Sequence, residues 1–95
     1  MLGTSTSLAI GATADDVCRS YGELAEKIMT LRQRGVSLSE LIDSLAKTED
    51  EDTNKVTRSM ILSAYEQPQY GTAEYQKAKA GEFKNNIELF CYQSQ

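Results

Sequence analysis

The placement of the two cysteines constrains this chain more than any other feature. Cys18 and Cys91 lie near opposite ends of the patterned part of a 95-residue sequence. A metal site needs about four ligands and a redox pair usually has Cys-x-x-Cys spacing, so the pair fits a disulfide better than either. The alternative is two reduced, buried cysteines in a cytosolic protein.

A disulfide would compensate for the small size of the domain. A chain of this length buries only about 60 to 65% of its unfolded surface, so its core alone leaves little stability. Closing a loop of about seventy residues would restrict the unfolded chain by roughly 4 kcal/mol. We therefore expect a Cys18–Cys91 bridge.

Composition excludes several classes of function. The chain contains no histidine, which excludes an imidazole general base, Ser/His or Cys/His nucleophile pairs and histidine-containing zinc sites. Ten basic residues against fourteen acidic ones give a net charge of -4, which opposes binding to nucleic acid. No catalytic motif is recognisable in the sequence. We expect no enzymatic activity, no cofactor, no metal and no nucleic-acid partner.

Apolar spacing predicts two helices in the first half of the chain. Apolar residues recur every three or four positions over residues 17–31, and Gly35 follows where a left-handed C-terminal residue is favoured. Ser37 and Glu40 have the spacing of a capping box, which predicts a short second helix that ends near Lys47. The apolar stripe of the first helix is Val17, Tyr21, Leu24, Ile28 and Leu31.

Two further helices are predicted in the second half. The third should end around Glu66, because Pro68 disfavours helical backbone just before it. Thr72 is a good N-cap for a long last helix over residues 73–92, in which Gly81 marks either a close helix crossing or a weak point. The apolar stripes are Val56, Met60, Ile61, Ala64 and Tyr65 in the third helix, and Ala80, Phe83, Ile87 and Phe90 or Cys91 in the fourth.

These elements predict an all-α fold, a compact bundle of about four helices in a single domain over residues 15–95. A bridge between Cys18 and Cys91 requires their α carbons to lie within about 7 Å. The first and last helices would then run roughly antiparallel. The second helix is too short to match them, so a regular up-down bundle is not required.

Residues 1–14 form either the remnant of an export signal or a flexible tail, and we favour the first. Ala12-Thr13-Ala14 before Asp15 matches the small-residue pattern that signal peptidase accepts. However, no Lys or Arg precedes it, and the apolar patch at residues 8–10 is too short for a complete signal. No segment approaches the ~18 to 20 apolar residues of a membrane span, so we expect no membrane insertion.

Several segments stand in a distinctive order after Asp15: Cys18–Gly35, Val36–Glu40, Ala64–Tyr70, Tyr75-Gln76, Phe83–Asn85 and Cys91-Tyr92. In this order they resemble a group of small exported helical proteins encoded in bacteriophages, prophages and their bacterial hosts. The resemblance implies a periplasmic or secreted location and a disulfide, and it implies no particular activity. The incomplete export signal departs from the pattern of the group. Host cytoplasm with reduced cysteines is therefore the alternative.

The turn between the third and fourth predicted helices is the first candidate surface for binding another protein. Tyrosine combines apolar area with a polar tip and is common at recognition surfaces. The alternative is that the tyrosines pack the corner and the proline fixes the turn. The candidate residues are Tyr65, Gln67, Pro68, Gln69, Tyr70 and Tyr75.

Four adjacent acids are the second candidate, as a docking strip for a basic partner. Such a strip raises association rates more than affinity. The alternative is a solvated cap, because acidic side chains favour the N-terminus of the helix that follows. The residues are Glu49, Asp50, Glu51 and Asp52.

These observations predict a small phage-associated accessory protein that binds another protein and inhibits or modulates it. The alternative is a structural or homo-oligomeric component of a particle or of the cell envelope. In that case the apolar helix faces would pair between chains.

Overall fold

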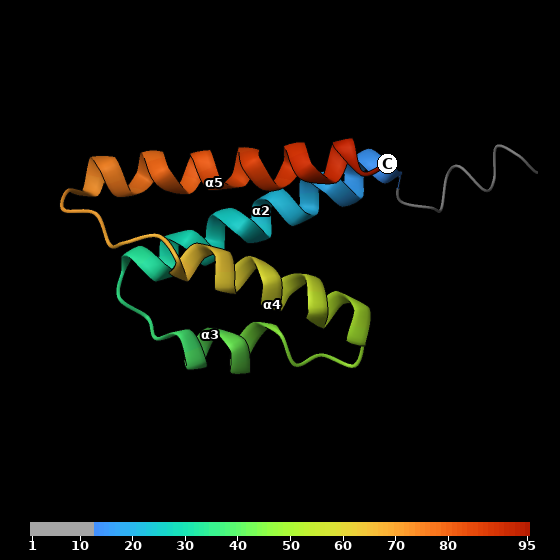
Figure 1. Cartoon of the computed structure of the whole chain (residues 1–95), viewed down its shortest axis with the longest axis horizontal. Coiled ribbons are helices and arrows are strands. Elements are labelled where there is room, and N and C mark those ends of the chain that lie inside the picture. The colour runs from blue at the N-terminus through green and yellow to red at the C-terminus, as the bar shows by residue number, and fades with distance from the viewer. Residues whose placement is uncertain (1–12) are drawn as a thin grey trace, which may run out of the picture.

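The computed structural model describes residues 13–95, and these form an all-α fold of four helices. In chain order the helices are α2 (Ala14–Gln33), α3 (Leu38–Leu45), α4 (Glu51–Tyr65) and α5 (Ala73–Gln93). Figure 1 shows α2 between α5 and α4, with α3 packed against α4 on the side away from α2. The predicted fold class is confirmed, and the C-terminal ends of the helices lie within two residues of the predicted ones.

The first and last helices, α2 and α5, make the most extensive contact of the fold. They run antiparallel, so that the N-terminal end of α2 lies beside the C-terminal end of α5 (Figure 1). Cys18 and Cys91 form a disulfide there, with their α carbons 5.5 Å apart. The predicted bridge and the predicted antiparallel arrangement are both confirmed.

Local sequence signals determine where the helices begin and end. Thr13 caps α2 in a capping box with Asp16, whose backbone N–H donates to the Thr13 hydroxyl at 3.0 Å. Ser37 and Thr72 cap α3 and α5 through their hydroxyls. Gly35 ends α2 with a φ of +89°, a conformation that favours glycine.

The first helix thus begins slightly earlier than the sequence indicated. Residues 13 and 14, which the sequence assigned to the N-terminal segment, are the cap and the first residue of α2. The rest of that segment, with its apolar patch at residues 8–10, lies outside the described residues.

The core lies where α2 meets its two neighbours. In the predicted stripe of α2 only Ile28 is fully buried, whereas Val17 is exposed. A second line of smaller residues is buried toward α5: Cys18 is bonded to it, and Gly22 lies against the side chain of Glu88. Because α2 packs between two helices, it buries two of its faces. The predicted stripe of large apolar residues marks only one of them. The buried core residues are Ala25, Ile28, Met29, Leu41, Ala46, Met60, Ile61, Ala64, Ala80 and Phe83.

The close crossing of α2 and α5 lies at Gly22 and not at Gly81. A Cβ added to Gly22 would collide with the carboxylate arm of Glu88, whereas nothing lies within 4 Å of a Cβ added to Gly81. The first interpretation of Gly81, a close helix crossing, is therefore wrong. Gly81 is instead a weak point of the helix, because glycine has a helix propensity about 1 kcal/mol less favourable than that of alanine.

The disulfide should supply a large part of the stability. We expect the double variant Cys18→Ala, Cys91→Ala to lose about 4 kcal/mol of unfolding free energy, because the unfolded chain regains the freedom of a long loop. Urea denaturation followed by circular dichroism measures the loss. Wild-type protein in excess reductant is the control and should unfold at the same urea concentration as the variant. Equal stability with and without the bridge would contradict this account.

Candidate functional site

The corner, defined as the turn over residues 65–75 together with the C-terminal end of α2, is held by one buried amide. Gln33 is only 4% exposed. Its Nε2 donates to the Pro68 carbonyl at 2.9 Å, and its Oε1 accepts from the Tyr70 backbone N–H at 2.7 Å. The Gln69 side chain donates to the Gln33 carbonyl at 3.1 Å. The turn is thereby fixed to α2.

Tyr65 and Gln67 make further contacts within the corner. The Tyr65 hydroxyl donates to the Val36 carbonyl, and burial raises the pKa of that hydroxyl. The Arg32 guanidinium lies 4.8 Å from the centre of the Tyr65 ring. The same guanidinium donates to the Gln67 carbonyl at 2.9 and 3.1 Å. These contacts connect the end of α2 to the end of α4.

Tyr70 and Tyr75 complete the predicted set. Their rings pack edge to face with centroids 4.9 Å apart, and Lys79 Nζ lies 5.5 and 5.3 Å from the two ring centres. The structure therefore brings the six predicted corner residues together. It also uses many of their polar groups within the chain, while Tyr75 is exposed. Partner binding through this corner stays a prediction.

The amide of Gln33 should matter for stability. We expect Gln33→Ala to lower the unfolding free energy by about 2 kcal/mol, because it leaves the Pro68 carbonyl and the Tyr70 N–H without their partner. Urea denaturation measures the change. Gln93→Ala, an exposed glutamine at the end of α5, is the matched control and should stay within about 0.5 kcal/mol of wild type. A similarly small effect at Gln33 would show that the corner is held by other contacts.

The four-acid run lies at the start of α4. Asp50 is the N-cap, and its carboxylate accepts from the Thr53 hydroxyl at 2.9 Å and from the Asp52 backbone N–H at 3.1 Å. These bonds, the Thr53 hydroxyl foremost, hold the pKa of Asp50 below its ordinary value. Glu51 and Asp52 occupy the first turn, and Glu49 precedes the cap. The expected cap is present, and docking of a basic partner stays a prediction.

Two acidic residues at helix starts, Asp16 in α2 and Asp50 at the cap of α4, should make the fold sensitive to acid. The Arg19 guanidinium, 2.6 Å from Asp16, is the main cause of a lowered pKa at that carboxyl, with Thr13 adding to it. Because both folded-state pKa values are depressed, the stabilisation is present above the ordinary value of about 3.9 and is lost as pH falls through the folded-state values. We expect melting temperature to fall below about pH 4, and less steeply in Asp16→Asn, Asp50→Asn. Parallel curves for wild type and variant would refute this origin.

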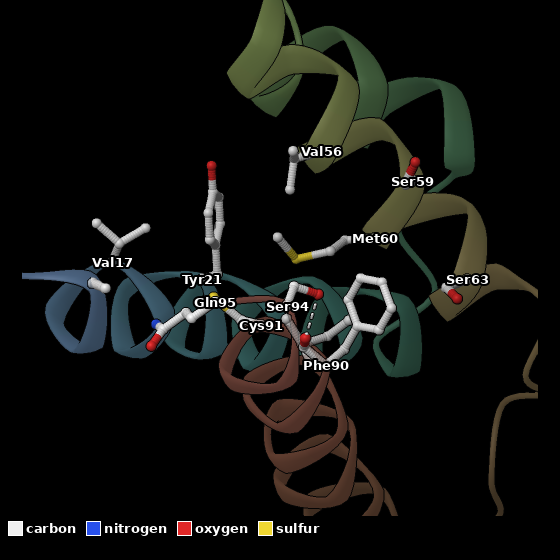
Figure 2. Close-up of a pocket in the computed structure, with 12 residues that line it drawn as sticks. Val17, Tyr21, Val56, Ser59, Met60, Ser63, Phe90, Cys91, Ser94 and Gln95 are labelled. Atoms are coloured by element: carbon white, nitrogen blue, oxygen red, sulfur yellow. Dashed lines mark hydrogen bonds between the residues drawn. The ribbon is translucent and has the colours of Figure 1, made fainter.

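An apolar groove of about 800 Å³ opens at the other end of the molecule, which we call the open end. Here α2 and α4 begin and α5 finishes, and Figure 1 shows α2 and α4 diverging from the corner toward this end. Figure 2 shows side chains from all three helices around the groove. Its apolar lining is Ala14, Val17, Tyr21, Val56, Met60, Ile87, Phe90 and Cys91.

Three of these side chains are exposed although their stripes predict burial. Val17 is 42% exposed, Val56 is 40% exposed and Phe90 is 70% exposed. Of the two alternatives for the last position of the α5 stripe, the structure therefore selects Cys91, which takes part in the disulfide, and not Phe90. None of the helices formed by residues 13–95 covers these three side chains, because α3 packs on α4 and not across the open end. The helices continue past the end of the core.

The chemistry of the groove is apolar with a few hydroxyls. Its twelve lining residues include Ser59, Ser63 and Ser94 but no Asp, Glu, Lys or Arg. The Ser94 hydroxyl donates to the Phe90 carbonyl at 2.8 Å, the bond drawn in Figure 2. Such a surface can bind apolar side chains and accept or donate a few hydrogen bonds at its edge.

The sequence contains one signal that could have revealed this groove. The predicted first and last helices span about four and about five turns, whereas the predicted second helix spans fewer than about three turns. A helix that short leaves apolar positions at the end of the longer ones uncovered. Apolar spacing alone treats every position of a stripe as core, so it predicted burial of Val17 and Val56 and allowed burial of Phe90.

Comparison of the chain with protein-family models, with curated proteins and with solved structures gives no match. Within residues 13–95, every helix is too short or too polar to cross a membrane.

Proposed function

We propose that this protein acts by binding another protein, and that the groove at the open end is the binding site. The observation that carries the proposal is the exposure of Val17, Val56 and Phe90 around a single groove. Single exposed apolar residues are ordinary, but a contiguous exposed group that lines a concave surface marks an interaction site.

The composition of the groove fits a protein ligand. Aromatic residues and methionine are enriched at the centres of protein interfaces, where charged residues are depleted. Phe90, Tyr21 and Met60 supply that kind of surface, and the lining carries no charged side chain. Phe90 is the natural hot spot, because its ring is large and most of it is accessible to a partner.

The setting of this activity follows from the disulfide and from the sequence resemblance. Disulfides persist in oxidising compartments, so the Cys18–Cys91 bridge supports a periplasmic or secreted location. Resemblance to small exported proteins of phages and their hosts supports an accessory role, as an inhibitor or modulator of a host or phage protein. The bridge also lies beside the groove, since Cys91 is one of its lining residues.

The proposal predicts that one surface residue controls protein capture and that its neighbour does not. Immobilised wild-type protein and two variants are exposed to periplasmic and cytoplasmic extracts of the bacterial host, and the captured proteins are quantified by mass spectrometry. Phe90→Ser should lose the specific partner by at least about tenfold, because it removes the hot-spot ring. Leu89→Ser is the matched control, since Leu89 is 55% exposed on the same helix but does not line the groove.

The design separates the groove from the corner. Tyr70→Ala should retain the partner that Phe90→Ser loses. Loss of capture in Tyr70→Ala alone would place binding at the corner and would refute the groove as the site. Identical capture profiles for wild type and Phe90→Ser would also refute the groove as the site.

A further inference from the structure

We infer that the occupant of the groove is an amphipathic helix of another protein, with an apolar face and a polar face rich in Lys or Arg. This inference rests on the proposed function and names the chemistry of the partner. Two observations carry it: the position of the apolar groove between α2 and α4, and the acidic residues at the starts of these two helices.

The position of the groove fits a helix. The groove opens between α2 and α4, which diverge from the corner (Figure 1), and the last turns of α5 form its third side (Figure 2). Packed helices lie about 8 to 10 Å apart and interlock side chains from rows three and four residues apart. A helix in this opening could contact Val17 on one side and Val56 on the other, with Phe90 against its end. Binding of an amphipathic helix in an apolar groove is a common recognition mode.

The charge around the groove is strongly acidic. Six of the fourteen acidic residues of the chain lie at residues 15–16 and 49–52, where α2 and α4 begin. Asp52 precedes Val56 by four residues, so it shares the helix face that lines the groove, and it is exposed. The basic residues in the first two turns of these helices are Arg19, which is paired with Asp16 at 2.6 Å, and Lys55. An apolar groove with an acidic border selects a ligand whose apolar face has basic neighbours.

The same charge pattern disfavours two other occupants. A second copy of this chain would bring an identical acidic border against the first, and like charges across an interface oppose association. A fatty acid or anionic lipid could place its acyl chain in the groove, but its head group would meet the acids of α2 and α4. A basic helix satisfies both the apolar lining and the acidic border.

A peptide selection tests the inference. The full chain, oxidised, is used to select from a displayed library of helix-forming peptides of about 16 residues with randomised positions. Selection against Phe90→Ser and Leu89→Ser is run in parallel. We expect the wild-type protein and Leu89→Ser to enrich peptides with apolar residues at i, i+3 or i+4 and i+7, together with Lys or Arg on the other face. Phe90→Ser should lose this enrichment.

Synthetic peptides then test the charge directly. The best enriched peptide is compared by fluorescence anisotropy with a twin in which every Lys and Arg is replaced by Glu. The twin should bind at least about fivefold more weakly at low salt, and the difference should shrink at 0.5 M salt because surface charges are screened. Asp15→Asn, Asp52→Asn should reduce the difference between the twins without abolishing the dependence on Phe90.

Each other outcome overturns the inference in a recognisable way. Equal binding of both twins, still lost in Phe90→Ser, removes the basic helix but leaves protein binding at the groove intact. Enrichment that is the same for Phe90→Ser and wild type removes the groove as the site, and with it the proposed function. Enrichment that appears only when Leu8→Ser, Ile10→Ser is introduced identifies the chain's own N-terminal segment as the occupant. Concentration-dependent dimerisation that Phe90→Ser abolishes identifies a second copy.

Discussion

The antiparallel contact between α2 and α5 is the constraint from which the rest of the structure follows. The Cys18–Cys91 bridge fixes it at one end, and at the other end the buried amide of Gln33 holds the turn that leads into α5. Between these points small residues let the helices approach closely, most clearly at Gly22. A chain too short to build a large core obtains a defined geometry in this way.

The position of α4 depends on this pair but is fixed less evenly. At the corner, Tyr65 and the turn after it are connected to the end of α2 by hydrogen bonds and by the Arg32 contact. Toward its N-terminal end, α4 diverges from α2 and is stabilised locally by the Asp50 cap and by the packing of α3. The core therefore ends before the helices do. The groove is the physical consequence, because apolar stripes continue where no described helix faces them.

The two candidate surfaces differ in how they use their side chains. The corner residues Gln69 and Tyr70 direct polar groups into the chain, so their contribution to the fold is visible in the structure. Val56 and Phe90 at the groove leave much of their apolar area exposed and have no comparable structural task. A partner that covers such a surface removes apolar area from water, which favours association.

The sequence alone predicted the four helices, the caps at Ser37 and Thr72 and the favoured disulfide, because each depends on local chemistry or on a single pair of residues. Thr72 before α5, Gly35 after α2 and the spacing of the two cysteines were sufficient for these conclusions. Only the tertiary structure decided which apolar residues are core and which are surface. Val17, Val56 and Phe90 fit their stripes as well as Ile28 does, yet they are exposed. Burial depends on what lies opposite a helix face, and periodicity within one helix contains no information about that.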